Sequence, residues 1–186
     1  MSRLILGIDP GSYRTGWGLI EDGPARPNLV ECGVIRLTEG VSFPLRLHHL
    51  QTQFAILVQR LSPACSAVES PFHGASARSS LQLAHARGVL LAVLAGAGVP
   101  VTEYTPATVK KAVTGNGRAE KAQVGAMVLR ILEVGTRSWP GDATDALGVA
   151  LCHASSLAYE TALGGCRPQG SARLHRKGAG QVPRVV

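Results

Sequence analysis

The stretch RLILGIDPGS, residues 3–12, opens the chain and decides how the rest of it folds. Residues 3–8 form a short apolar run, which predicts a buried strand in the middle of a sheet. Asp9 stands at the carboxyl end of this strand. Pro10 and Gly11 follow with the chemistry of a turn, because proline fixes φ and glycine accepts a positive φ. The pattern therefore predicts a central strand that ends in a carboxylate.

Two more strands are predicted directly after the first. Residues 15–21 and 29–37 are rich in apolar side chains, and Gly23-Pro24 with Pro27-Asn28 marks the connection between them. Three consecutive strands joined by short connections favour an antiparallel meander.

Helices are predicted where apolar residues recur three and four positions apart. The segments with this spacing are residues 43–61, 81–97, 119–133 and 142–163, and a shorter one around Lys110 and Lys111.

Two further strands lie among these helices. Residues 65–69 form a short apolar strand that ends in Glu69, and residues 100–104 form another. The polar residues 70–79 favour a loop. Together with the meander, this order predicts one α/β domain in which a mixed sheet is flanked by helices.

The predicted helix at residues 81–97 is apolar on almost every side in its C-terminal part. Such a helix is usually buried on more than one side. In a one-domain protein, we expect the second side to face a partner subunit. The residues predicted for this dimer interface are Leu83, Arg87, Leu90, Leu91 and Leu94.

The length of 186 residues suits one domain, which we place at residues 1–163, followed by a flexible basic tail at residues 164–186. The tail holds five Lys and Arg residues and no acid, so it supplies most of the net charge of +7. Either it adds salt-dependent affinity for a polyanion or it is a disordered end. The rest of the chain has 14 basic and 12 acidic residues, so evidence for nucleic-acid binding there depends on where the charges lie.

Cysteine usage and the N-terminal segment favour a cytoplasmic protein. The four cysteines lie far apart without a CxxC pair, which argues against a zinc site and a disulfide framework and favours reduced thiols. The apolar run before Asp9 is too short for a signal peptide. No stretch approaches the roughly 20 apolar residues that span a bilayer, so we expect no membrane association.

Four carboxylates are predicted to converge at one end of the sheet. Asp9 and Glu69 end two strands that a crossover connection makes central and adjacent. Asp142 and Asp145 are three residues apart at the start of a helix and therefore share one face. Taken singly, Asp142 also fits a helix N-cap, Asp145 a first-turn acid and Asp9 a turn residue.

Taken together, the four acids predict a metal site. Two carboxylates about 4 Å apart repel by roughly 4 kcal/mol at an effective dielectric constant near 20, and a divalent cation removes this repulsion. Ligands that are all oxygen suit Mg²⁺ or Mn²⁺ rather than Zn²⁺. Two such ions about 3.5–4 Å apart are the usual arrangement for phosphodiester hydrolysis.

The acids belong to a set of motifs that resembles one known family. The motifs are GIDPGS at 7–12, VE at 68–69, ARG at 86–88, AEK at 119–121 and DATDAL at 142–147. Their order and spacing resemble those of the RuvC family of Holliday junction resolvases, over roughly residues 3–160. The resemblance implies an RNase H-like α/β fold with a five-stranded mixed sheet flanked by α-helices on both faces. It also implies a homodimer that nicks four-way DNA junctions symmetrically in recombination and repair, with a RuvAB-type branch-migration motor as partner.

The resemblance also implies roles for single residues. Asp9, Glu69, Asp142 and Asp145 match the family's metal ligands, although some relatives have His at the position of Asp142. Lys121 matches the catalytic lysine that contacts the scissile phosphate.

Further residues are predicted to contact DNA. Lys110 matches a basic position that faces DNA, and Phe72 an aromatic that stacks on junction bases. Arg78, in the same predicted loop as Phe72, suits a contact with a phosphate or with the partner subunit. Lys111 and Arg118 are candidate phosphate contacts. A solvated helix face is the alternative for all four basic residues, Lys110, Lys111, Arg118 and Lys121.

Three other functions start from similar sequence features. Actin-like phosphate-loop ATPases also open with a strand that ends in Asp, but they need two such domains. A ribonuclease acting on RNA–DNA hybrids usually takes its second carboxylate from the first helix, and residues 43–61 contain no acid. A non-catalytic nucleic-acid-binding relative has no use for four carboxylates. We therefore predict a junction endonuclease.

Overall fold

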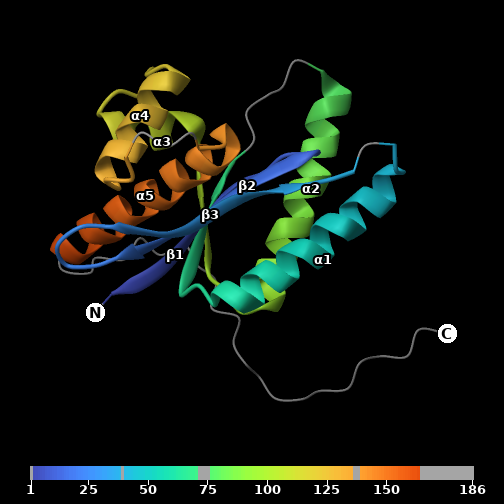
Figure 1. Ribbon diagram of the computed structural model, residues 1–186, viewed down its shortest axis with the longest axis horizontal. Coiled ribbons are helices and arrows are strands. Elements are labelled where there is room, and N and C mark those ends of the chain that lie inside the picture. Colours follow the sequence, from blue (N-terminus) through green and yellow to red (C-terminus); the bar gives the residue numbers. More distant parts are fainter. Residues whose placement is uncertain (1, 39, 71–75, 136–138, 164–186) are drawn as a thin grey trace.

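The computed structural model describes residues 2–38, 40–70, 76–135 and 139–163. Five strands and five helices follow one another along this part of the chain (Figure 1). The strands are β1 (Arg3–Asp9), β2 (Arg14–Asp22), β3 (Asn28–Arg36), β4 (Cys65–Glu69) and β5 (Val101–Tyr104). The helices are α1 (Phe43–Leu61), α2 (Ala77–Gly96), α3 (Pro106–Thr114), α4 (Lys121–Ile131) and α5 (Gly141–Ala162). Each predicted strand and helix is present, with boundaries that differ by a few residues.

The strands form one sheet in the order β3-β2-β1-β4-β5. β1 pairs antiparallel with β2, and β2 pairs antiparallel with β3, which confirms the predicted meander. β4 pairs parallel with β1, and β5 pairs parallel with β4. The sheet is therefore mixed, and the first strand lies at its centre with its carboxyl end beside that of β4.

Helices cover both faces of the sheet, as predicted. α1 and α2 pack together on one face, while α5 crosses the other and carries α3 and α4 on its outer side (Figure 1). Successive residues of a strand point to opposite faces. Accordingly, Leu6 and Ile8 pack against α1 and α2, whereas Ile5 packs against the α4–α5 side.

Local sequence signals explain how α1 is bounded. Pro44 occupies the first turn, where a missing N–H costs no helical hydrogen bond. The buried side chains Leu50, Phe54 and Leu57 recur at helical spacing on the face toward the sheet. The helix ends at Leu61, and its C-cap Ser62, directly before Pro63, has a φ of 46°.

Helix α2 begins earlier than predicted. Residues 77–79 were expected in a polar loop, but they form the first turn of the helix, so Arg78 projects from a helix rather than from a loop. Ser76 is the N-cap, and its hydroxyl accepts a hydrogen bond from the backbone N–H of Ser79 at 3.1 Å. This cap allows a polar stretch to start a helix without apolar side chains.

The interface predicted on α2 is wrong for two of its residues. Leu90 and Leu94 are fully buried in the chain's own core against α1 and the sheet, so they offer no surface to a partner. Leu83, Arg87 and Leu91 keep partial exposure.

Glycines bring α5 unusually close to the sheet. A Cβ on Gly7 of β1 would overlap the carbonyl oxygen of Ala146, and one on Gly16 of β2 would overlap that of Asp142. Glycine within a strand often marks such a close approach of another backbone. Because the contact at Gly16 lies at the start of α5, it sets where the first residues of that helix stand.

Some predictions fall on residues outside the described part of the chain. They concern Phe72, the middle of the predicted loop at 71–75 and the basic tail at 164–186. Within the described residues, we find no helix with the length and apolar character needed to cross a membrane.

Candidate active site

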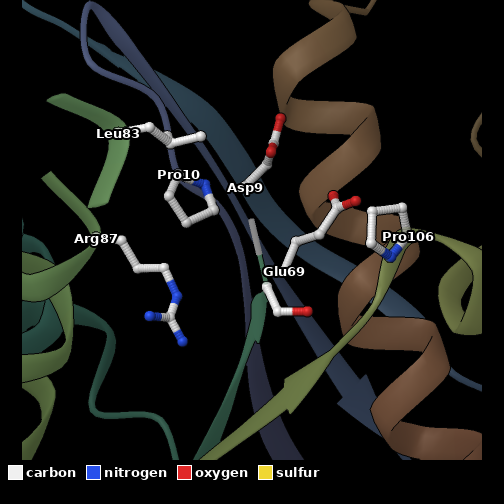
Figure 2. A pocket seen from close by; sticks show the side chains of 7 residues that line it. Asp9, Pro10, Glu69, Leu83, Arg87 and Pro106 are labelled. Atoms are coloured by element: carbon white, nitrogen blue, oxygen red, sulfur yellow. The ribbon is translucent and has the colours of Figure 1, made fainter. Parts of the chain in front are cut away.

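Asp9 and Glu69 lie side by side at the carboxyl ends of two parallel strands. The register pairs Ile8 of β1 with Val68 of β4, so the acid that follows each of them stands at the same level of the sheet. Figure 2 shows the Glu69 carboxylate close to Pro106 at the start of α3 and the Asp9 carboxylate pointing toward α5. The adjacency predicted from the strand order is confirmed.

The turn that follows Asp9 is fixed on two sides. The Thr15 hydroxyl donates a hydrogen bond to the carbonyl oxygen of Gly11 at 3.2 Å and closes the turn. The guanidinium of Arg46, which is buried near the start of α1, lies 3.9 Å from the centre of the Tyr13 ring. These contacts hold the backbone beside Asp9 against the rest of the domain.

Asp142 and Asp145 approach Asp9 from the first two turns of α5. One carboxylate oxygen from each of the three aspartates lies within 4.8 Å of the others. Asp142 is not the N-cap of its helix, because Pro140 holds that position. The structure thus brings three of the four predicted acids into one cluster.

Glu69 lies beside this cluster rather than within it. Among the described residues, the group of oxygens within 4.8 Å contains the three aspartates alone. Glu69 still lines the same two hollows as Asp9. It therefore faces the same space from the neighbouring strand.

Burial and the charges of neighbouring acids disfavour the ionised forms of Asp9 and Glu69. Burial raises the pKa of Asp9 to about 7, and the charges of Glu69, Asp145 and Asp142 add to the rise. Burial and the charge of Asp145 also raise the pKa of Glu69. Raised pKa values at Asp9 and Glu69, beside further carboxylates that are good cation ligands, are typical of a metal site.

Lys121 provides the nearest positive charge. Its ammonium nitrogen lies 2.5 Å from a carboxylate oxygen of Asp145, and this contact raises the pKa of Lys121. The side chain is 72% exposed, whereas that of Asp145 is 20% exposed. Lys121 opens α4, so its ammonium reaches the edge of the acid cluster from the solvent side.

The basic residues predicted to contact DNA take different places. Lys110 and Lys121 line one hollow of about 310 Å³ with Asp9, Glu69 and Asp145. Lys111 lines a separate hollow between α3 and α5. Arg118 is exposed in the turn before α4. The predicted cations therefore divide between the acid cluster and the surface around it.

A second hollow, of about 160 Å³, adjoins the acids on the α2 side. Asp9, Pro10, Glu69, Leu83 and Arg87 line it (Figure 2). The sequence predicts Arg87 for a dimer interface, and its position beside the acids was not predicted. Its motif at 86–88 was the available signal, but the direction of its side chain depends on how α2 packs beside β5.

The donor set fits a hard divalent cation. All candidate ligands are carboxylates, and the described part of the chain places no His or Cys among them. Mg²⁺ and Mn²⁺ prefer such oxygen ligands. The cluster can therefore hold a metal that acts on a phosphodiester.

Comparison with known proteins also indicates a nuclease. The family described as "Crossover junction endodeoxyribonuclease RuvC" matches residues 5–153. A protein of that name from Magnetococcus marinus is 44% identical over 149 residues, which are 80% of this chain and 82% of the relative. The structure of Thermus thermophilus RuvC in complex with a Holliday junction substrate superposes with a TM-score of 0.77 at 29% identity, covering 88% of this chain and 97% of that one. A yeast mitochondrial Holliday junction resolvase, with a TM-score of 0.60 and 14% identity over 86% of this chain and 83% of that one, shares the fold.

Proposed function

The chain belongs to the RuvC family of crossover junction endodeoxyribonucleases, and we propose that it resolves four-way DNA junctions by paired, symmetric nicks in recombination and DNA repair. The observation that carries this proposal is the cluster of Asp9, Asp142 and Asp145 oxygens within 4.8 Å of one another, with Glu69 beside it. Neither a hybrid-specific ribonuclease nor an actin-like ATPase is favoured by these relatives.

Asp9, Glu69, Asp142 and Asp145 are the proposed metal ligands. Their carboxylates suit two ions, Mg²⁺ or Mn²⁺, in each active site. Held by these residues, such ions would supply activation of a water molecule and stabilisation of the leaving 3′ oxygen. Asp9 is ionised only in part near pH 7, so cation binding is favoured by rising pH through the release of its proton.

Lys121 is proposed to stabilise the scissile phosphate. In the free protein its ammonium is paired with Asp145, a contact with one highly exposed partner. A phosphate in the hollow offers this ammonium a second acceptor at the acid cluster, where negative charge develops during hydrolysis. Lys110 lines the same hollow and suits a neighbouring phosphate of the strand.

A dimer follows from the geometry of the substrate. Symmetric nicks need one active site on each of two opposing strands, which a two-fold dimer supplies. Leu83 and Leu91, the partly exposed leucines of α2, are the proposed contacts. We further propose a RuvAB-type motor as partner and the cytoplasm as location, which suits the free thiols of Cys32, Cys65 and Cys152.

Cleavage of a labelled synthetic four-way junction tests the function. The wild type is compared with Asp145→Asn on the junction, a linear duplex and an RNA–DNA hybrid, with Mg²⁺ or Mn²⁺. We expect symmetric nicks in the junction alone, lost in the variant while binding survives. Preferential cleavage of the hybrid would move the protein to the ribonucleases, and no cleavage with either ion would leave a binding protein.

A further inference from the structure

Arg87 stands on the opposite side of the catalytic acids from the two lysines. Residues of α3, α4 and α5 line the hollow that contains Lys110 and Lys121, whereas α2 lines the hollow of Arg87. Asp9, Glu69 and Pro106 line both. We propose that Arg87 binds a backbone phosphate of the cleaved strand next to the scissile one, and that Glu103 holds its guanidinium until DNA arrives. This inference rests on the proposed function.

The guanidinium has hydrogen-bonding capacity that the free protein leaves unused. One Nη of Arg87 is paired with a carboxylate oxygen of Glu103. Its Nε is buried, and within the described residues no acceptor contacts it. Arginine presents Nε and Nη as a fork that matches two phosphate oxygens. Because Nε is itself covered, a phosphate in the adjoining hollow pairs with it when the guanidinium turns away from Glu103.

The ion pair with Glu103 is suited to exchange. The side chain of Glu103 is 47% exposed, and ion pairs with an exposed partner are weak and screened by salt. The side chain of Arg87 is only 18% exposed and lines the pocket, so a change of partner needs a turn of the guanidinium but no new position of the whole side chain. A phosphate competes for this arginine at little cost in conformational freedom.

Glu103 also keeps the Arg87 guanidinium away from the proposed metal ligands. An unpaired guanidinium beside Glu69 and Asp9 would form its own ion pair with the acids and compete with the metal. Val68 pairs with Glu103 in the sheet, so Glu69 and Glu103 belong to neighbouring strands but alternate to opposite faces. Glu103 thus draws Arg87 to the α2 face and leaves the metal ligands free.

Cations on both sides of the acids match the shape of the substrate. A DNA strand carries a phosphate at every nucleotide, so a strand whose scissile phosphate lies at the acids extends other phosphates to either side. Lys110 and Lys121 face the phosphates on one side of the acids, and Arg87, shown in Figure 2, faces those on the other. Pro10 supplies an apolar side of the Arg87 hollow, which suits a sugar.

The two halves of the same ion pair provide a matched test. Arg87→Ala and Glu103→Gln each remove the ion pair, but only the first removes the proposed phosphate contact. Binding of a labelled four-way junction to the full chain is measured in Ca²⁺ between 50 and 200 mM salt, and the oligomeric state by sedimentation. We expect Arg87→Ala to bind the junction about tenfold more weakly, with a slope of log affinity against log salt concentration that is smaller by about one. Glu103→Gln should bind as tightly as the wild type or more tightly. The affinity of Arg87→Lys should lie between those of Arg87→Ala and the wild type.

Equal effects of Arg87→Ala and Glu103→Gln on binding would show a structural ion pair and overturn the inference. So would an unchanged salt slope, or dissociation of Arg87→Ala to monomers. If the wild type cleaves the junction and these results appear, only the inference fails. A wild type that neither binds nor cleaves the junction would instead remove the proposed function and, with it, the role of Arg87.

Discussion

Replacing Asp9 by Asn is expected to stabilise the metal-free protein at neutral and alkaline pH while abolishing its activity. The folded protein holds Asp9 with a pKa of about 7, compared with 3.8 for an unperturbed Asp. Between these two values the folded state binds more protons than the unfolded state, so the free energy of unfolding falls as the pH rises. Below pH 4 both states are protonated, and Asn and Asp are then nearly equivalent.

The magnitude follows from the shift. A difference of about three pKa units at 1.36 kcal/mol per unit gives at most about 4 kcal/mol of destabilisation above pH 7. Urea denaturation of the wild type and Asp9→Asn in EDTA, at several values between pH 4 and pH 8, measures it. The difference between the two proteins should grow across this window. Asp22→Asn, at the other end of the sheet, controls for the loss of one charge.

Metal addition should reverse the order of stability. A cation that binds only the folded wild type raises its free energy of unfolding according to concentration and affinity. Asp9→Asn lacks a ligand and should gain much less from Mg²⁺ or Mn²⁺. A difference in stability that stays constant from pH 4 to pH 8, or an equal gain from the metal in both proteins, would refute the electrostatic account of the acid cluster.

Three other changes test separate parts of the structure. Lys121→Ala should slow single-turnover junction cleavage by about 100-fold or more while junction binding is largely kept, because the charge on the scissile phosphate is lost. Gly16→Ala should lower the free energy of unfolding by about 1–3 kcal/mol and weaken metal binding, because its Cβ meets the carbonyl oxygen of Asp142. The control Gly96→Ala has open space around its Cβ and should change neither quantity. Urea denaturation and metal titration measure the two effects. Leu91→Glu should give monomers in sedimentation that bind junctions poorly, and a Leu91→Glu dimer would contradict the interface.

The central features of the site could be predicted from the sequence because they depend on strand order. A short apolar run that ends in Asp9 predicts a buried strand, and a crossover from the meander predicts that the strand ending in Glu69 lies beside it. The structure confirms both. The spacing of Asp142 and Asp145 predicted a shared helix face, and the structure brings that face to Asp9.

The errors arose where one pattern has two physical causes. Helix α2 is apolar on most sides, but hydropathy does not separate the side toward the chain's own core from the side toward a partner. Leu90 and Leu94 face the core, while the outer side has small residues such as Ala84, Gly88 and Ala92, which count as apolar yet bury little. The direction of Arg87 likewise depends on the packing of α2 beside β5.

The glycines under α5 have a consequence for how this enzyme can be modified. The spacing between Asp9 and the two acids of α5 is set by contact of one backbone with another, without side chains between them. Exchanging core residues between the sheet and α1 or α2 alters packing on the other face and leaves that spacing unchanged. Thermal stability and catalytic geometry can therefore be engineered separately in this fold, provided that Gly7 and Gly16 are kept.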